Sequence, residues 1–268
     1  MSDLPSTADV VIIGGGVMGA STAYHLCLKG CQNVLLLERE PFFGSQATGR
    51  CAGGIRYQFS TEINVRLSLL SLPMLDRFEE ETGQPIDRRR TGYLFLLTSQ
   101  ESLSSFQETV AMQRRLGVRT EWLTPEEIAT RVPHLNLDGV LAGTNHADDG
   151  LADPNSVVQG YVSGARRLGA KLLTDVEVTD IQVQDNKIRG VMTNEGYVSA
   201  PYVVNAAGPW AGVVGKMAEV DIPIVPLRRQ IAVTGPLPEV PTDFPFVIDF
   251  DQSLYFHPEG DGLLTGMS

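Results

Sequence analysis

The stretch VIIGGGVMGA, residues 11–20, places four glycines directly after a run of branched apolar residues. Residues 10–13 predict a short buried strand, and residues 17–30 predict a helix. Gly14, Gly16 and Gly19 fall at the turn between them and form a G-x-G-x-x-G pattern. In this context the first glycine permits a tight turn, the second lets a pyrophosphate approach the backbone, and the third lets the helix pack closely on the strand. The helix N-terminus would favour the negative charge of a phosphate.

A second predicted strand, residues 33–37, follows the helix and leads into Glu38. Glu38 lies 19 positions after Gly19, where a dinucleotide-binding unit carries the acidic residue that accepts hydrogen bonds from a ribose. The glycine pattern alone is a weak signal. The complete order of strand, turn, helix, strand and acid indicates a dinucleotide site.

The composition narrows the choice of partner and compartment. A net charge of −11 and a pI near 4.8 argue against nucleic acid or an anionic membrane as the main partner. Residues 1–9 lack the basic and apolar regions of a signal peptide, and no run reaches the roughly 18 apolar residues of a membrane span. We therefore expect a cytoplasmic location. The three cysteines and the histidines His134 and His146 show no ligand spacing, so the sequence predicts no metal site.

The order of the remaining predicted elements indicates two interleaved domains. A glycine-rich loop at residues 41–54 interrupts the dinucleotide-binding fold, which resumes near residue 154. Between and after these points the pattern predicts helices within 61–83 and at 100–116, a strand at 91–97, a capping box at 124–127, a helix at 154–168, strands at 171–174 and 202–208, a β meander at 176–198, and only strands after about residue 220.

Seven segments together resemble the D-amino-acid-oxidase-like FAD-dependent oxidoreductases, in particular the branch of the sarcosine oxidase β subunit and glycine oxidase. The β subunits of dye-linked proline dehydrogenase are nearby. The resemblance extends over essentially the whole chain, in order. Its segments are VVIIGGGVMGASTAYHL (10–26), LLLERE (35–40), GSQATGRCAGGIR (44–56), DGLADPNSVV (149–158), TDVEVTDI (174–181), VVNAAGPWA (203–211) and YFHPEGDGLLTGM (255–267).

The resemblance implies an α/β fold, α+β over the whole chain, in which a glutathione-reductase-like Rossmann FAD domain is interleaved with a mainly antiparallel β substrate domain. The expected FAD domain comprises residues 1–82 and 149–218, and the expected substrate domain comprises residues 83–148 and 219–268. Members of the family continue beyond the point where this chain stops. We therefore expect a fragment with an incomplete C-terminal part, or a chain that a partner completes.

The resemblance also implies bound FAD. We expect FAD to be non-covalent and the Cys51 thiol to be buried, because the covalent linkages of the family do not correspond to this position. The expected cofactor-binding residues are Gly14, Gly16, Val17, Met18, Gly19, Glu38, Arg39, Ser45, Thr48, Gly49, Arg50, Cys51, Val178, Ala207, Gly208 and Trp210.

The chemistry implied is oxidation of a small primary or secondary amino acid such as sarcosine. Hydride passes from a carbon next to the amine to flavin N5, and the resulting imine hydrolyses. Arg56 is expected near the flavin ring, Tyr255 at the substrate carboxylate, and His257 on the same strand face as Tyr255. These three form the predicted catalytic set.

Two alternatives remain open at this level. The chain could be a catalytically silent flavin-binding or partner-binding subunit, or an oxidoreductase for a 2-hydroxy acid or glycerol phosphate. Expected partners are an amino-acid substrate and other subunits of a hetero-oligomeric oxidase or dehydrogenase. Tight FAD retention with a spectrum that an amine bleaches would favour the enzyme, and a colourless chain that takes up flavin only with a second polypeptide would favour the silent subunit. A substrate panel that includes 2-hydroxy acids tests the other alternative.

Overall fold

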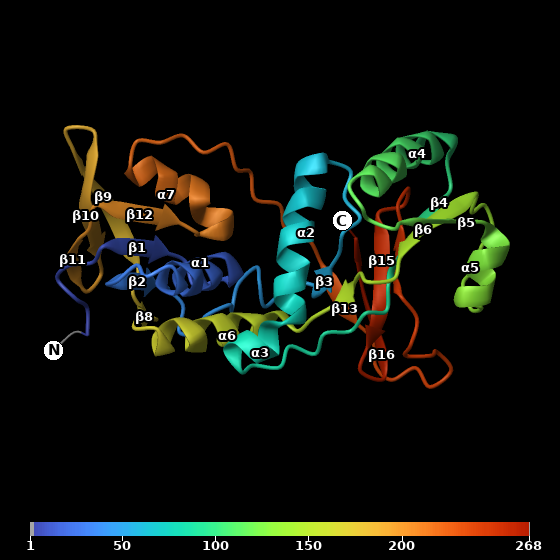
Figure 1. Ribbon diagram of the computed structural model, residues 1–268, viewed down its shortest axis with the longest axis horizontal. Helices are drawn as coiled ribbons and strands as arrows, with labels where there is room; N and C mark the ends of the chain where they lie inside the picture. The colour runs from blue at the N-terminus through green and yellow to red at the C-terminus, as the bar shows by residue number, and fades with distance from the viewer. Residues whose placement is uncertain (1–2, 268) are drawn as a thin grey trace. The chain divides into compact units, whose positions relative to one another are not determined.

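The computed structural model describes residues 3–267. The chain forms two compact units, each made of segments that are discontinuous in sequence (Figure 1). Unit 1 takes in Met1–Cys51, Phe78–Ile86 and Asp153–Leu227. Unit 2 takes in Ala52–Arg77, Asp87–Ala152 and Arg228–Ser268. The mixture of parallel and antiparallel sheets confirms the predicted fold class.

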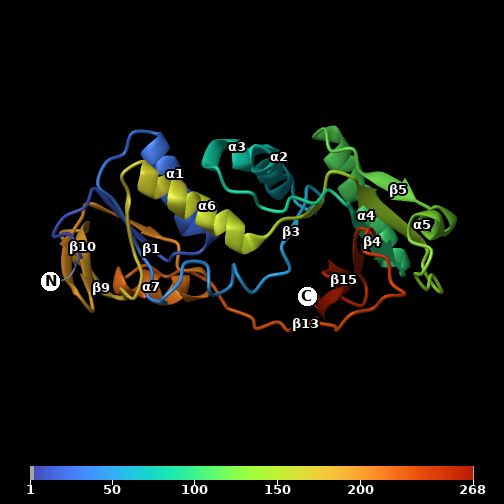
Figure 2. The ribbon, with the colours of Figure 1, turned by 90° about the horizontal axis from the view of Figure 1, so that it is seen from below.

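Unit 1 is built on a four-stranded parallel sheet in the order β12-β1-β2-β8. Every residue of β1 and β2 is buried, which is why both segments are continuous runs of branched apolar residues. The helices α1 and α6 lie side by side in both ribbon views (Figures 1 and 2). The bounds are β1 Val10–Ile13, α1 Val17–Leu28, β2 Val34–Leu37, α6 Pro154–Arg167, β8 Lys171–Leu173 and β12 Tyr202–Asn205.

A three-stranded antiparallel sheet, β11-β10-β9, packs its apolar side chains with those of the parallel sheet. Val178, Ile181 and Val191 share one buried cluster with Val11 and Leu35. The turn between β9 and β10 has positive φ at two successive residues, as a two-residue hairpin turn requires. The bounds are α3 Phe78–Thr82, β9 Val178–Gln184, β10 Lys187–Thr193, β11 Gly196–Ser199, η1 Gly208–Trp210 and α7 Ala211–Met217.

Unit 2 is built on a seven-stranded sheet in the order β13-β16-β15-β14-β4-β6-β5. Every neighbouring pair is antiparallel except β14 with β4, which agrees with the mainly antiparallel sheet we predicted. A two-stranded ladder joins β3 to β7. The bounds are β3 Gly54–Ile55, β4 Tyr93–Leu97, β5 Glu121–Leu123, β6 Ala142–His146, β7 Gly150–Leu151, β13 Ile231–Val233, β14 Phe246–Asp249, β15 Leu254–Glu259 and β16 Gly262–Met267.

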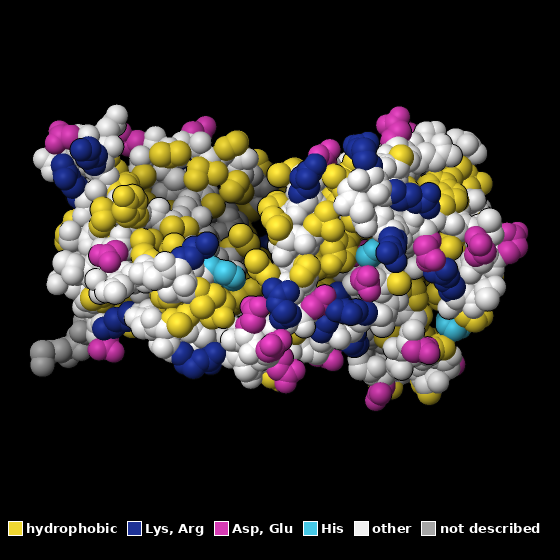
Figure 3. Space-filling model, in the orientation of Figure 1, with side chains coloured by type: hydrophobic (Ala, Val, Ile, Leu, Met, Phe, Trp, Pro, Cys, Tyr) yellow, Lys and Arg dark blue, Asp and Glu magenta, His cyan; other side chains and the backbone are white. Residues whose placement is uncertain are grey.

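Three helices accompany this sheet: α2 (Glu62–Asp76), α4 (Gln100–Arg115) and α5 (Pro125–Arg131). The predicted capping box at the start of α5 is present, since both reciprocal hydrogen bonds form. The helix α2 is apolar on two opposite sides, and hydrophobic side chains are visible over it in Figure 3. Its buried side carries Val65 and Leu72, and its exposed side carries Ile63, Leu67, Leu70 and Met74.

Residues 52–77, which we assigned to the FAD domain, group with unit 2 in the structure. Contacts of α2 and its preceding loop account for this grouping. The Gln113 side chain of α4 donates a hydrogen bond to the Phe59 carbonyl oxygen at 3.0 Å, and Asp76 at the end of α2 pairs with Arg88 and Arg90. The division into a cofactor domain and a substrate domain stays a prediction.

The N-terminus of α4 is held by one carboxylate from a distant part of unit 2. Asp251 accepts hydrogen bonds from the Thr98 backbone N–H at 2.7 Å, from its hydroxyl at 2.9 Å, and from the hydroxyls of Ser99 and Ser102. Desolvation raises the pKa of Asp251, but these hydrogen bonds outweigh it and hold the pKa at about 2. Asp251 therefore stabilises the fold most in its ionised form.

Candidate functional site

Unit 1 contains an open cavity whose empty space, including the solvent in its mouth, is about 950 Å³. Its wall comes from the carboxyl ends of β1, β2 and β12, the first turn of α1, the loop after β2, and α7. In open parallel sheets, ligands bind at the carboxyl ends of the strands. Twelve of the predicted cofactor residues line this cavity: Gly14, Gly16, Val17, Met18, Glu38, Arg39, Ser45, Thr48, Val178, Ala207, Gly208 and Trp210.

The glycine pattern is required by close backbone approaches. Gly14 has φ +106°, and a Cβ there would lie 2.5 Å from the Ala206 carbonyl oxygen. A Cβ on Gly19 would overlap the Gly14 carbonyl oxygen. The turn therefore sits directly against both β12 and α1. Gly19 does not line the cavity, because its place is under the turn rather than beside the opening.

The first turn of α1 presents backbone donors to the cavity. The N-cap Gly16 offers no side-chain cap, and the Val17 N–H donates to the Thr48 hydroxyl oxygen at 3.1 Å. The buried hydroxyl of Ser45, which also lines the cavity, has no hydrogen-bond partner among residues 3–267. A helix N-terminus beside the unpaired Ser45 hydroxyl fits a phosphate.

Glu38 lies at the end of β2, with its carboxylate against the glycine turn. One oxygen accepts the Gly15 N–H at 2.6 Å, and the other accepts the Glu40 N–H at 2.9 Å. Each carboxylate oxygen can accept a second hydrogen bond. Glu38 is therefore fixed in place and keeps capacity for the two hydroxyls of a ribose.

Arg39 and Trp210 form another part of the cavity wall. The Arg39 guanidinium carbon lies 4.0 Å from the centre of the Trp210 ring, which is a close cation–π contact. Trp210 comes from η1, just after β12. These flat groups suit a planar aromatic ligand such as adenine.

Three other predicted cofactor residues lie away from the cavity wall. The Gly49 N–H donates to the Gly44 carbonyl oxygen at 2.7 Å, and the Arg50 Nε donates to the Ser45 carbonyl oxygen at 3.0 Å. Both therefore shape the loop that carries Ser45 and Thr48. The prediction of a buried Cys51 thiol is wrong: Cys51 is exposed, since it ends this loop at a boundary of unit 1.

In unit 2, the predicted catalytic residues Tyr255 and His257 lie on one face of the seven-stranded sheet. The Phe246 ring contacts both residues, at 5.6 Å from the Tyr255 ring and 4.8 Å from the His257 ring. It also stacks on Tyr93, with ring centres 4.3 Å apart and 8° between the planes. This aromatic face is formed by adjacent strands β4, β14 and β15.

Arg56 joins the same aromatic face. Its guanidinium carbon lies 4.6 Å from the centre of the Phe59 ring, 5.3 Å from that of Phe95 and 5.7 Å from that of Tyr93. Within residues 3–267 it makes no hydrogen bond and no ion pair. Desolvation by burial lowers the pKa of Arg56, opposed by the charges of Tyr93 and Asp149. Arg56 is thus a desolvated cation without a direct counter-ion in the described chain.

The two strand residues differ in their surroundings. Tyr255 is half-buried, whereas His257 is only 1% exposed. His257 Nδ1 lies 2.8 Å from the Pro258 carbonyl oxygen, so Nδ1 carries the proton and donates it. Nε2 then keeps a lone pair and has no partner in the described part of the chain. Desolvation lowers the pKa of His257, which favours this neutral form.

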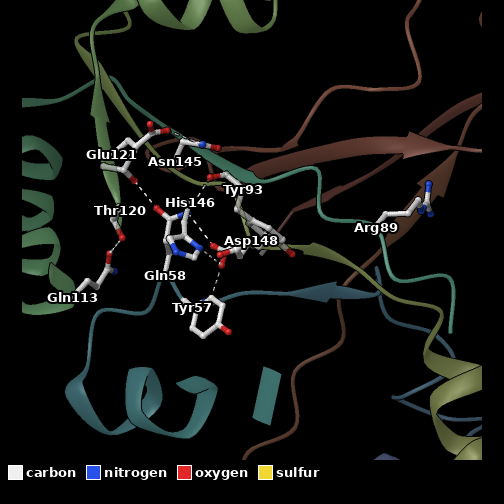
Figure 4. A network of polar contacts seen from close by, with 12 residues as sticks. Tyr57, Gln58, Arg89, Tyr93, Gln113, Thr120, Glu121, Asn145, His146 and Asp148 are labelled. Atoms are coloured by element: carbon white, nitrogen blue, oxygen red, sulfur yellow. Dashed lines mark hydrogen bonds and ion pairs between the residues drawn. The ribbon is translucent and has the colours of Figure 1, made fainter. Parts of the chain in front are cut away.

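A buried polar network in unit 2 was not predicted (Figure 4). It links His146 to Asp149, with 3.1 Å between Nδ1 and a carboxylate oxygen, and links Gln58 to the same carboxylate. We considered His146 only as a possible metal ligand, so this hydrogen bond was not predicted. The signal was the His-x-x-Asp spacing within NHADDG, residues 145–150, but Gln58, which completes the network, is 91 positions from Asp149 in sequence.

Residues 3–267 contain neither a membrane-spanning helix nor a cluster of metal-ligating side chains. No helix in that range is both long and apolar enough to cross a bilayer. No group of three or more His, Cys, Asp and Glu side chains in that range is placed to hold a metal ion. The cytoplasmic location stays a prediction.

Known proteins are similar to this chain in sequence and in architecture. Dimethylglycine dehydrogenase, mitochondrial, of Rattus norvegicus is 36% identical over 263 residues, covering 97% of this chain and 30% of that protein. The pyruvate dehydrogenase phosphatase regulatory subunit, mitochondrial, of Mus musculus is 28% identical over 267 residues, covering 98% of this chain and 30% of that protein. The chain thus spans less than a third of the length of these curated relatives.

Among solved structures, the L-proline dehydrogenase from P. horikoshii superposes with a TM-score of 0.90 at 36% identity, covering 98% of this chain and 70% of that one. The family model described as "DAO: FAD dependent oxidoreductase" matches residues 9–268. This confirms the resemblance and the cofactor class inferred from the sequence. The chain belongs to the DAO family of FAD-dependent oxidoreductases.

Proposed function

We propose that this chain carries the FAD-binding and substrate-binding parts of an oxidoreductase that oxidises a small amino acid at a carbon next to its amine, with sarcosine-like N-methyl glycines as the leading class. One observation carries the proposal: Arg56 is a desolvated cation with no counter-ion within the described chain. A carboxylate is the ligand that such a guanidinium binds most strongly. The relative whose name includes dimethylglycine supports the substrate class.

The cavity residues have defined parts in holding FAD. Gly14, Gly16 and the N-terminus of α1 would accept the pyrophosphate, and Glu38 would accept the ribose hydroxyls. Arg39 and Trp210 would lie against adenine. Bound FAD supplies a two-electron acceptor that takes hydride from the substrate carbon and leaves an imine for water to hydrolyse.

The sheet residues would bind and orient the substrate. Arg56 would bind the carboxylate, and the Tyr255 hydroxyl would add a second hydrogen bond to it. His257 is buried on the same sheet face and would support the position of Tyr255 from within the sheet rather than touch the substrate. The sequence singles out the same three residues, but it predicts Arg56 near the flavin ring; its role at the substrate carboxylate is proposed from its surroundings in the structure.

The test begins with the visible absorption spectrum of the purified chain after addition of FAD. Anaerobic titration follows with sarcosine, N,N-dimethylglycine, proline, glycine and a 2-hydroxy acid. Bleaching of the flavin bands by an amine supports the proposal, and bleaching only by the 2-hydroxy acid contradicts it. Acid precipitation then distinguishes covalent from non-covalent FAD, since only non-covalent FAD remains in the supernatant.

The matched variants are Arg56→Met and Arg56→Lys. Loss of the guanidinium should raise KM by about 10- to 100-fold, corresponding to a charge-assisted bond of about 1.5–3 kcal/mol. Lysine should recover part of the loss, because it keeps the charge but not the planar fork. An unchanged KM in Arg56→Met would remove this residue from the site.

A second candidate is a regulatory subunit that binds flavin without turnover. The similarity to the pyruvate dehydrogenase phosphatase regulatory subunit favours it, because a protein of that description shares the same region at 28% identity. Stable FAD binding with no bleaching by any amine or hydroxy acid would favour this candidate over the enzyme.

A further inference from the structure

The Asp149 side chain is fully buried, at 0% exposure, in the middle of the polar network of unit 2. Its carboxylate accepts three hydrogen bonds: from the Tyr57 backbone N–H at 2.7 Å, from the Gln58 side-chain amide at 3.1 Å, and from His146 Nδ1 at 3.1 Å. No ion pair with an arginine or lysine is formed by this carboxylate within residues 3–267. The unfavourable burial of this carboxylate is therefore compensated by hydrogen-bond donors rather than by a directly paired cation.

Two of these donors lie on the residues immediately after Arg56. Tyr57 is held through its backbone, and Gln58 through its side chain (Figure 4). The Gln58 amide also donates to the Tyr93 carbonyl oxygen at 2.9 Å. The ring of that same Tyr93 lies under the Arg56 guanidinium. One carboxylate is thus connected both to the backbone that carries Arg56 and to the strand on which Arg56 rests.

The orientation of the Gln58 amide is fixed by a third residue. The Thr144 hydroxyl donates to Gln58 Oε1 at 3.0 Å, so Nε2 must point to Asp149 and to the Tyr93 carbonyl. Every group around Asp149 is therefore a donor: the Tyr57 N–H, the Gln58 amide and His146 Nδ1. Only a carboxylate can accept from all three through both of its oxygens.

We propose that Asp149 is a positioning residue for Arg56: it clamps residues 57 and 58 to the sheet and so fixes the guanidinium over Phe59, Phe95 and Tyr93 for a substrate carboxylate. The proposal rests on the proposed function of Arg56. Asp149 touches neither substrate nor cofactor in this role. Its effect on the reaction passes through the placement of Arg56.

The critical variant is Asp149→Asn, which keeps the size of the side chain but replaces one acceptor oxygen with a donor. That donor must face the Tyr57 N–H and His146 or the Gln58 amide, so at least one bond of the clamp is lost. Asp148→Asn is the matched control, because it makes the same chemical change at an exposed neighbouring side chain. Circular dichroism and thermal unfolding establish that both variants fold.

The first measurement is hydrogen exchange of the peptide that contains the Tyr57 amide, in the full chain loaded with FAD. Asp149→Ala, which removes both acceptor oxygens, should increase exchange at Tyr57 at least 10-fold, and Asp148→Ala should leave it within twofold, with folding checked in the same way. Equal protection in wild type and Asp149→Ala would overturn the clamp. This readout needs no turnover, so it decides the clamp even if no amine bleaches the flavin and the proposed function fails.

The second measurement is a double-mutant cycle with Arg56→Met, using the KM and kcat of N,N-dimethylglycine or of whichever amine bleaches the flavin. Asp149→Asn alone should raise KM about 10-fold and change kcat less. In the Arg56→Met background it should raise KM by less than twofold, because the group that it positions is gone. An undiminished effect in that background would show that Asp149 acts independently of Arg56 and would refute the proposal.

Discussion

Gly14→Ala tests whether the close packing of the glycine turn, rather than its backbone conformation alone, is essential. Gly14 has φ +106°, which costs an alanine about 1–2 kcal/mol. Its added Cβ would also lie 2.5 Å from the Ala206 carbonyl oxygen at the end of β12, and overpacking of this kind costs about 1–3 kcal/mol. The variant should therefore lower the free energy of unfolding of unit 1 by about 2–5 kcal/mol.

Gly30→Ala supplies the matched control. Gly30 also has a positive φ, +85°, but a Cβ there would meet no atom within 4 Å. It should lose only the conformational part, about 1–2 kcal/mol. Urea unfolding in a Trp122→Phe background, followed by the fluorescence of Trp210 in unit 1, measures both variants.

The difference between the two variants isolates the packing of the turn against β12. We expect Gly14→Ala to be less stable than Gly30→Ala by about 1–3 kcal/mol and to lose FAD affinity as well, because the turn lines the cavity. Equal unfolding free energies would refute the reasoning, because the end of β12 would then have shifted to admit the Cβ without destabilising the fold.

Three further variants test other parts of the structure. Asp251→Asn should lower the unfolding free energy at pH 7 by about 1 kcal/mol, after allowance for solvent screening. Because the pKa of Asp251 is depressed in the folded state, the wild type should lose this advantage as pH falls from about 4 to 2. Urea titrations of both proteins at pH 7 and pH 3 would show the loss. Arg39→Met should weaken FAD binding about 3- to 10-fold by removing the contact with Trp210, as measured by titration of flavin fluorescence. Gly54→Ala would place a Cβ on the Tyr93 hydroxyl oxygen and so displace the ring over which the Arg56 guanidinium lies. It should therefore raise KM more than it lowers kcat in steady-state assays.

The elements predicted from the sequence are those with a strong local signal. The strand, turn and helix around Gly14, Gly16 and Gly19 combine a buried apolar run with glycines at fixed spacing. The β meander predicted at residues 176–198 turns at Asp185 and Asn186, which are residue types that tolerate positive φ. In both cases the pattern that decides the structure lies within a few residues, so it can be recognised without the rest of the chain.

The unpredicted parts depend on contacts between distant segments. The strand β6 has the sequence AGTNH, without a run of branched apolar residues, and it is stabilised by pairing with both β4 and β5. The aromatic surroundings of Arg56 arise because Phe59 and two residues of β4 meet in space. Asp149, the partner of His146, is close to it in sequence. The network also requires Gln58, whose side chain reaches Asp149 across 91 positions.

The two tryptophans are divided between the two compact units: Trp210 lies in unit 1 and Trp122, on β5, lies in unit 2. Because the sequence contains only these two, replacing either one with phenylalanine leaves an intrinsic fluorophore that reports on a single unit. A pair of such variants would show whether the units unfold in one cooperative transition or in separate steps. It would also give each unit its own melting temperature, and FAD should raise the one reported by Trp210.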